Sequence, residues 1–173
     1  MIGDAWNQLT NDSFDIGPHL LALVIAYLLA LPLGWDREKE ERSAGLRTFP
    51  LVAIASCGFV QAAETVMGDN PEAMSKVIEG LITGIGFIGG GAILRMKASV
   101  KGTATAASLW ATGAIGTAVG LGAVDVAVVL TIVTFVTLTV LSPIKKATGL
   151  EDDDKLLEKE EAEAEDGGLP NMN

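Results

Sequence analysis

Residues 104–141 read ATAASLWATGAIGTAVGLGAVDVAVVLTIVTFVTLTVL, and the only charged side chain among them is that of Asp125. A helix needs about 20 apolar residues to cross the roughly 30 Å hydrocarbon core of a bilayer, so this stretch is too long for one span. Two glycines just before Asp125 favour a turn at that point. The stretch therefore predicts two membrane-spanning helices, over Thr103–Gly120 and Val124–Leu141.

Three further apolar segments of similar length precede this stretch, and they cover Pro18–Trp35, Thr48–Met67 and Lys76–Leu94. Backbone amides cannot stay unpaired in hydrocarbon, so helices are the default spanning element. The ten-residue alternating strands of an outer-membrane barrel are not found in the sequence. The predicted fold class is all-α, an integral membrane bundle of five transmembrane helices within residues 18–146.

Basic residues predict the orientation of this bundle. Arg37, Lys39, Arg42 and Arg47 follow the first span, Arg95, Lys97 and Lys101 follow the third, and Lys145 and Lys146 follow the fifth. The other loops hold only Lys76. Because basic loops stay in the cytoplasm, the N-terminal segment 1–17 is predicted outside and the C-terminus inside. A bacterial inner (plasma) membrane fits this pattern.

Most of the net negative charge of the chain lies in its C-terminal tail. The formal net charge is −10, and residues 151–166 contribute −8 of it through ten acidic residues and two lysines. The spanning part is therefore close to neutral, which excludes a case for nucleic-acid binding. The segment 147–173 is predicted to be an acidic, partly disordered cytoplasmic tail.

A glycine cluster marks the third span. Residues 84–89 read GIGFIG, which matches the dinucleotide-binding fingerprint in letters only, because that motif needs a strand before it and a helix opening at it. We interpret Gly84, Gly86 and Gly90 as positions where another helix approaches closely. The alternative is that the cluster unwinds the helix, as ion sites in transporters do.

The fourth span carries a second face of small residues, in which Ser108, Thr112, Gly116 and Gly120 follow one another at intervals of four. Residues at this spacing share one side of a helix. We expect the third and fourth spans to pack through their small faces, within one chain or between two.

Charged residues at the membrane edge are the candidate site. Asp36, Arg37 and Glu38 end the first span, Arg47 and Thr48 begin the second, and Glu79 lies within the third. Such residues either form an ion-binding or polar cluster or pair as solvated surface charges. The chain has one histidine and one cysteine, so the sequence indicates neither a metal site built from those residues nor a catalytic constellation. We therefore predict that the protein is not an enzyme and holds no cofactor. If the charged residues do bind an ion, Mg²⁺ is the ion we expect.

Three motifs then resemble the membrane domain of the MgtC/SapB family. They are Gly45-Leu46-Arg47-Thr48, the glycine-rich TGIGFIGGGAIL at 83–94, and VKGTATAASLW at 100–110. The match spans about residues 20–142. The resemblance implies a five-helix bacterial inner-membrane protein linked to growth in low magnesium, and a best-known member that restrains the F-type ATP synthase. The short acidic tail resembles the SapB-like form, without a folded cytoplasmic domain.

Two hypotheses of function follow. In the first, the chain is a non-enzymatic membrane protein of magnesium or ion homeostasis or stress adaptation, which acts by helix–helix assembly with itself, most simply as a dimer, or with another membrane protein. In the second, it is an oligomeric transporter or channel for Mg²⁺ or a similar cation.

Overall fold

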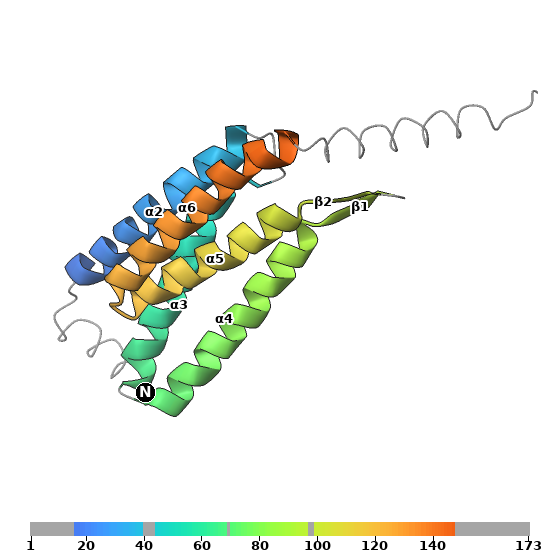
Figure 1. The fold of residues 1–173 in the computed structure, drawn as a ribbon. Helices are drawn as coiled ribbons and strands as arrows, with labels where there is room; N and C mark the ends of the chain where they lie inside the picture. Colours follow the sequence, from blue (N-terminus) through green and yellow to red (C-terminus); the bar gives the residue numbers. More distant parts are fainter. Residues whose placement is uncertain (1–15, 40–43, 69, 97–98, 148–173) are drawn as a thin grey trace, which may run out of the picture.

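A computed structural model describes residues 16–39, 44–68, 70–96 and 99–147. Five helices make up almost all of this part, and they are α2 (Ile16–Lys39), α3 (Thr48–Met67), α4 (Pro71–Gly91), α5 (Thr103–Gly120) and α6 (Val124–Ala147). They run alternately up and down (Figure 1). The predicted helical membrane bundle is confirmed. Residues 1–15 of the predicted outer segment and 148–173 of the predicted tail lie outside the described residues.

Four of the helices, α2, α3, α4 and the part of α6 up to Leu141, are long and apolar enough to cross a membrane. The remaining helix, α5, is not among these four, and alanine is interleaved with threonine, serine and glycine along it. It lies among the other four (Figure 1), and half of its residues are buried. A helix shielded by protein meets little lipid, so it can be built from small and hydroxylated residues.

The small face of α5 packs against α3. A Cβ added at Gly116 would lie only 2.9 Å from the Cα of Ala53, and one at Gly120 would lie 2.8 Å from the Cβ of Val60. Ser108 and Thr112 share this buried side, and the hydroxyl of Thr112 donates to the carbonyl of Ser108 at 2.8 Å. Within one chain the predicted partner was therefore wrong, because this face meets α3 rather than the glycines of α4.

The contact between α4 and α5 uses other residues. A Cβ at Gly89 would lie 3.2 Å from the carbonyl oxygen of Ala106, and the side chain of Ile85 fills the space left by Gly113. The predicted packing positions Gly84, Gly86 and Gly90 have nothing within 4 Å of an added Cβ. Helix α4 thus turns one narrow side to the bundle and leaves its glycine pairs open.

Local signals set the ends of α4. The side chain of Asn70 accepts a hydrogen bond from the amide of Ala73 at 3.1 Å, and Pro71 opens the first turn, a strong start signal. The helix therefore begins five residues before the predicted Lys76. It runs unbroken through the glycine cluster and ends at Gly91, with the amides of Ala92 and Ile93 bonded to Gly89 and Gly90.

A short hairpin, which the sequence analysis did not predict, follows α4. Strand β1 (Leu94–Met96) pairs antiparallel with β2 (Ser99–Lys101). Gly102 then begins α5 with a φ of +91°, and a side chain there would collide with the carbonyl of Ala92. This turn needs glycine both for its left-handed backbone and for its space.

Helix α2 continues to Lys39, beyond the predicted end at Trp35. Residues 36–39 therefore belong to its last turn, and their side chains are directed by the helix. Just before them, a Cβ at Gly34 would lie 3.2 Å from the carbonyl oxygen of Gly45. The chain entering α3 can approach α2 closely because both positions are glycines.

We expect Gly116→Ala to destabilise the bundle, because the added methyl group would overlap the backbone of α3 at Ala53. Overpacking of this kind costs about 1–3 kcal/mol. The matched control is Gly58→Ala in α3, where the only neighbour is Leu23 Cδ2 at 4.0 Å. Thermal unfolding in detergent, followed by size exclusion, compares the two. Equal stability of both variants would contradict the close α3–α5 contact.

Candidate functional site

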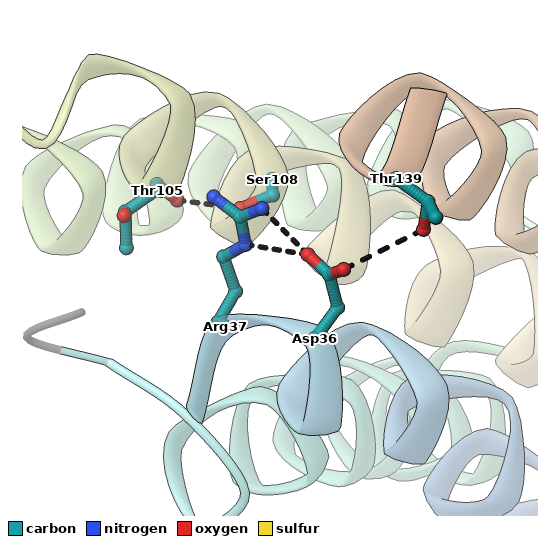
Figure 2. Close-up of polar contacts among 5 residues, drawn as sticks. All are labelled: Asp36, Arg37, Thr105, Ser108 and Thr139. Carbon is teal, nitrogen blue, oxygen red and sulfur yellow. Dashed lines mark hydrogen bonds and ion pairs between the residues drawn. The ribbon is translucent and has the colours of Figure 1, made fainter. Parts of the chain in front are cut away.

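A buried ion pair ends helix α2. Arg37 donates from Nε and from Nη2 to Oδ2 of Asp36, at 3.1 and 2.5 Å. The Arg37 side chain is 4% exposed and that of Asp36 is 17% exposed. Arginine is almost never this buried without a partner. Two adjacent residues can share the contact because the helix places their side chains on neighbouring sides facing α5 and α6 (Figure 2).

The pair is bonded to α6 and faces α5. The hydroxyl of Thr139 in α6 donates to Oδ1 of Asp36 at 3.5 Å. The guanidinium of Arg37 points toward Thr105 and Ser108, which belong to the first two turns of α5 (Figure 2). The Ser108 hydroxyl donates to the carbonyl oxygen of Thr105 at 2.9 Å. The result is a polar cluster, defined here as Asp36, Arg37, Thr105, Ser108 and Thr139.

Because the ion pair of Asp36 and Arg37 is buried, removing either charge from the pair is expected to destabilise the protein. Removing two charges from water is offset only if they are paired and well hydrogen-bonded, and taking away one partner leaves the other uncompensated. Asp36 uses two of the five guanidinium N–H groups. The other three have no hydrogen-bond acceptor among the described residues.

Glu38 contacts the segment that leads into α3. Its Oε2 accepts from the amide of Leu46 at 3.1 Å, and a side chain at Gly45 would collide with this carboxylate. The carbonyl of Gly45 in turn accepts from the amides of Thr48 and Phe49. The carboxylate at the end of α2 thus fixes the chain that enters α3.

The other predicted site residues lie apart from the pair. Arg47 is exposed, and Thr48 is half-buried at the first position of α3. Glu79 is exposed in α4. It lies twelve residues before Gly91, the last residue of this helix, and so about 18 Å along the helix axis from that end. The structure brings Asp36 and Arg37 together with Thr105 and Thr139, two residues that sequence reasoning missed because threonines are common in apolar helices.

A metal site finds no support in the described residues. No group of three or more histidine, cysteine, aspartate or glutamate side chains converges within ranges 16–39, 44–68, 70–96 and 99–147. A divalent cation such as Mg²⁺ prefers several oxygen ligands, usually including carboxylates. Asp36 alone, already paired with Arg37, does not make such a site.

Comparison with known proteins now adds to this geometry. Residues 23–147 match the model of the MgtC family, which is well over half of the chain. The chain belongs to the MgtC family. The matched region begins within α2 and ends with α6, so this MgtC-family chain carries the family's region across all five described helices.

Named relatives agree with this placement. The chain is 38% identical to Protein MgtC of Salmonella typhimurium over 67% of its own length and 49% of that protein. It is 36% identical to Protein MgtC of Brucella abortus over 69% of its length and 49% of that protein. Protein SrpB of Synechococcus elongatus is 34% identical, over 68% of this chain and 71% of SrpB. The MgtC-family chain thus spans about half the length of the two MgtC relatives. No solved structure matches it.

We expect Asp36→Asn to lower the stability of the bundle more than Thr139→Val. The first change leaves the buried Arg37 charge unpaired, a loss of about 3 kcal/mol. The second removes one long hydrogen bond, a loss below about 1 kcal/mol. Apparent melting temperatures in detergent give the order. If the two variants melted together, pairing of Arg37 with Asp36 would not stabilise the bundle.

Proposed function

We propose that this chain is a multi-pass protein of a bacterial inner membrane that acts without catalysis, through contacts between membrane helices. Its role is in magnesium or ion homeostasis, or in stress adaptation. The magnesium link rests on the resemblance of its motifs to the MgtC/SapB family. The mode of action rests on the surface of the bundle.

The observation that carries the proposal is the open side of α4. Gly80, Gly84, Gly86, Gly90 and Gly91 have nothing within 4 Å of an added Cβ. The first four form two pairs spaced by four residues, an arrangement that lets another helix approach the backbone closely. Gly80, Gly84 and Gly91 follow one line along α4, and Gly86 and Gly90 follow another. We call the part of the α4 surface that carries all five glycines the open α4 face.

A groove beside this face supports the same mode of action. It lies between α3 and α4, has a volume of about 420 Å³, and is lined almost entirely by apolar side chains and by Gly80 and Gly84. Phe59 borders it and is 62% exposed, while Phe87 on α4 is 84% exposed. Small residues beside projecting aromatic rings suit the packing of one helix against another.

A second copy of the chain is the partner we favour, most simply as a dimer, with another membrane protein as the alternative. Identical faces meet in a twofold dimer, so one open face per chain is enough. The basic residues at the ends of α2 and α4 favour a cytoplasmic position for that end of the bundle. In that orientation the N-terminus lies outside and the C-terminus inside.

We expect Gly84→Leu and Gly90→Leu to convert a dimer into a monomer, because each places a large side chain on the open α4 face. The control is Thr137→Leu, which adds apolar bulk at an exposed position of α6. Multi-angle light scattering on detergent-solubilised protein reports the mass. Monomer formation by Thr137→Leu as well, or an unchanged mass for all variants, would overturn the proposal.

Transport of a cation is the result that would favour the second hypothesis over this proposal. Purified protein in liposomes that moved Mg²⁺ above the background of empty vesicles would favour the transporter hypothesis. We expect no such flux, since the described residues offer no cluster of carboxylates along the helices.

A further inference from the structure

Two neighbouring cavities lie along α3 and α4. The first has a volume of about 340 Å³ and lies at the turn between the two helices, where Met67, Asn70 and Lys76 border it. The second is the apolar groove of about 420 Å³ between the same helices. Val77 lines both of them. The cavities therefore adjoin, and we call them together the α3–α4 cleft.

The α3–α4 cleft changes from polar to apolar along α4. Glu72 and Lys76 line the cavity at the turn, and both are exposed. Neither forms an ion pair with another residue in the described part of the chain. Further along the helix, Gly80, Gly84 and Ile88 line the groove, and a Cβ added at either glycine would meet nothing within 4 Å. One end of the cleft thus offers opposite charges, and the other offers space between almost entirely apolar walls.

The order of these groups matches that of a phospholipid whose headgroup carries an amine. Glu72 lies in the first turn of α4, and Lys76 follows one turn further into the span. Phosphatidylethanolamine carries its ammonium group outermost, its phosphate beneath it and its acyl chains below both. A carboxylate therefore lies at the level of the ammonium, and a lysine at the level of the phosphate, where charge-assisted hydrogen bonds can form.

The length of the groove suits one acyl chain. Lys76 and Ile88 are twelve residues apart in α4, which is about 18 Å along the helix axis. Half of the hydrocarbon core of a bilayer is about 15 Å thick. A chain that begins below Lys76 therefore reaches the far end of the groove within its own leaflet.

We propose that the α3–α4 cleft binds one molecule of phosphatidylethanolamine from the leaflet on the side of the α3–α4 turn. Glu72 accepts hydrogen bonds from the ammonium group, Lys76 donates to the phosphate, and an acyl chain fills the groove. Phosphatidylcholine has no N–H to donate to Glu72, and phosphatidylglycerol has no ammonium group. Gly86 and Gly90 line neither cavity, so a bound lipid leaves that line of the open α4 face to a second copy.

The test uses the full-length protein in nanodiscs that contain equal amounts of these three lipids. Native mass spectrometry then identifies the lipid that stays on the released protein. One variant combines Glu72→Lys with Lys76→Glu, which reverses the order of the charges and keeps the net charge. A second variant, Ala55→Leu, adds bulk to the groove from an exposed position of α3. The control is Asp125→Asn, which removes an exposed carboxylate at the same end of the bundle.

We expect wild-type protein to retain phosphatidylethanolamine about fivefold over phosphatidylcholine, the upper end of the effect of an exposed ion pair. The charge reversal should abolish this preference and Ala55→Leu should lower the retention of phosphatidylethanolamine, while Asp125→Asn behaves as wild type. No preference in wild-type protein, a preference that survives the reversal, full retention in Ala55→Leu, or an equal loss in Asp125→Asn would overturn the site. The same spectra give the number of chains, so loss of the lipid and loss of a dimer are read separately.

Discussion

The bundle depends on how closely α5 approaches α3. At Gly116 and Gly120 the absence of a Cβ lets the backbones of the two helices meet. Lipid tails are as apolar as leucine, so burying apolar area supplies little drive for helices to associate within a bilayer. Close contact between backbones supplies the dispersion energy instead. A helix of small residues can therefore hold the centre while the apolar helices face outward.

This arrangement explains where the polar groups lie. Because α5 sits inside, its hydroxyls at Thr105 and Ser108 are buried and lie next to the last turn of α2. The guanidinium of Arg37 points toward α5 while it stays paired with Asp36. The hydrogen bond from Thr139 to Asp36 adds a direct link between α6 and the end of α2. The open α4 face lies on a helix that contributes nothing to this cluster.

Much of the fold could be predicted from the sequence. Apolar length alone located all five helices, and the glycine pair before Asp125 located the turn between the last two. Helix ends were less predictable, because residues 36–39 are charged and were therefore assigned to a loop. In the structure they form the last turn of α2, where Arg37 pairs with Asp36 and Glu38 accepts a hydrogen bond from the amide of Leu46. The hairpin had no signal, since its strands are three residues each.

The site was predictable only in part. Charge at a membrane edge drew attention to Asp36 and Arg37, but their partners Thr105 and Thr139 lie far away in the sequence and only the packed bundle brings them close. Spacing by four identified the small side of α5 that is buried, while which helix it meets depends on tertiary structure. The face on α5 was taken by α3, and this left the face on α4 open.

The central claim is that the open α4 face is where a second copy packs, and disulfide trapping in native membranes tests it most directly. The single native cysteine, Cys57, is buried, so it gives no background. Cysteines placed singly at 84, 86 and 90 should form covalent dimers at one or more positions, because a disulfide needs Cβ atoms within about 4.5 Å, whereas a cysteine at 137 on α6 should not. Equal trapping at 137, or none on α4, would contradict the account.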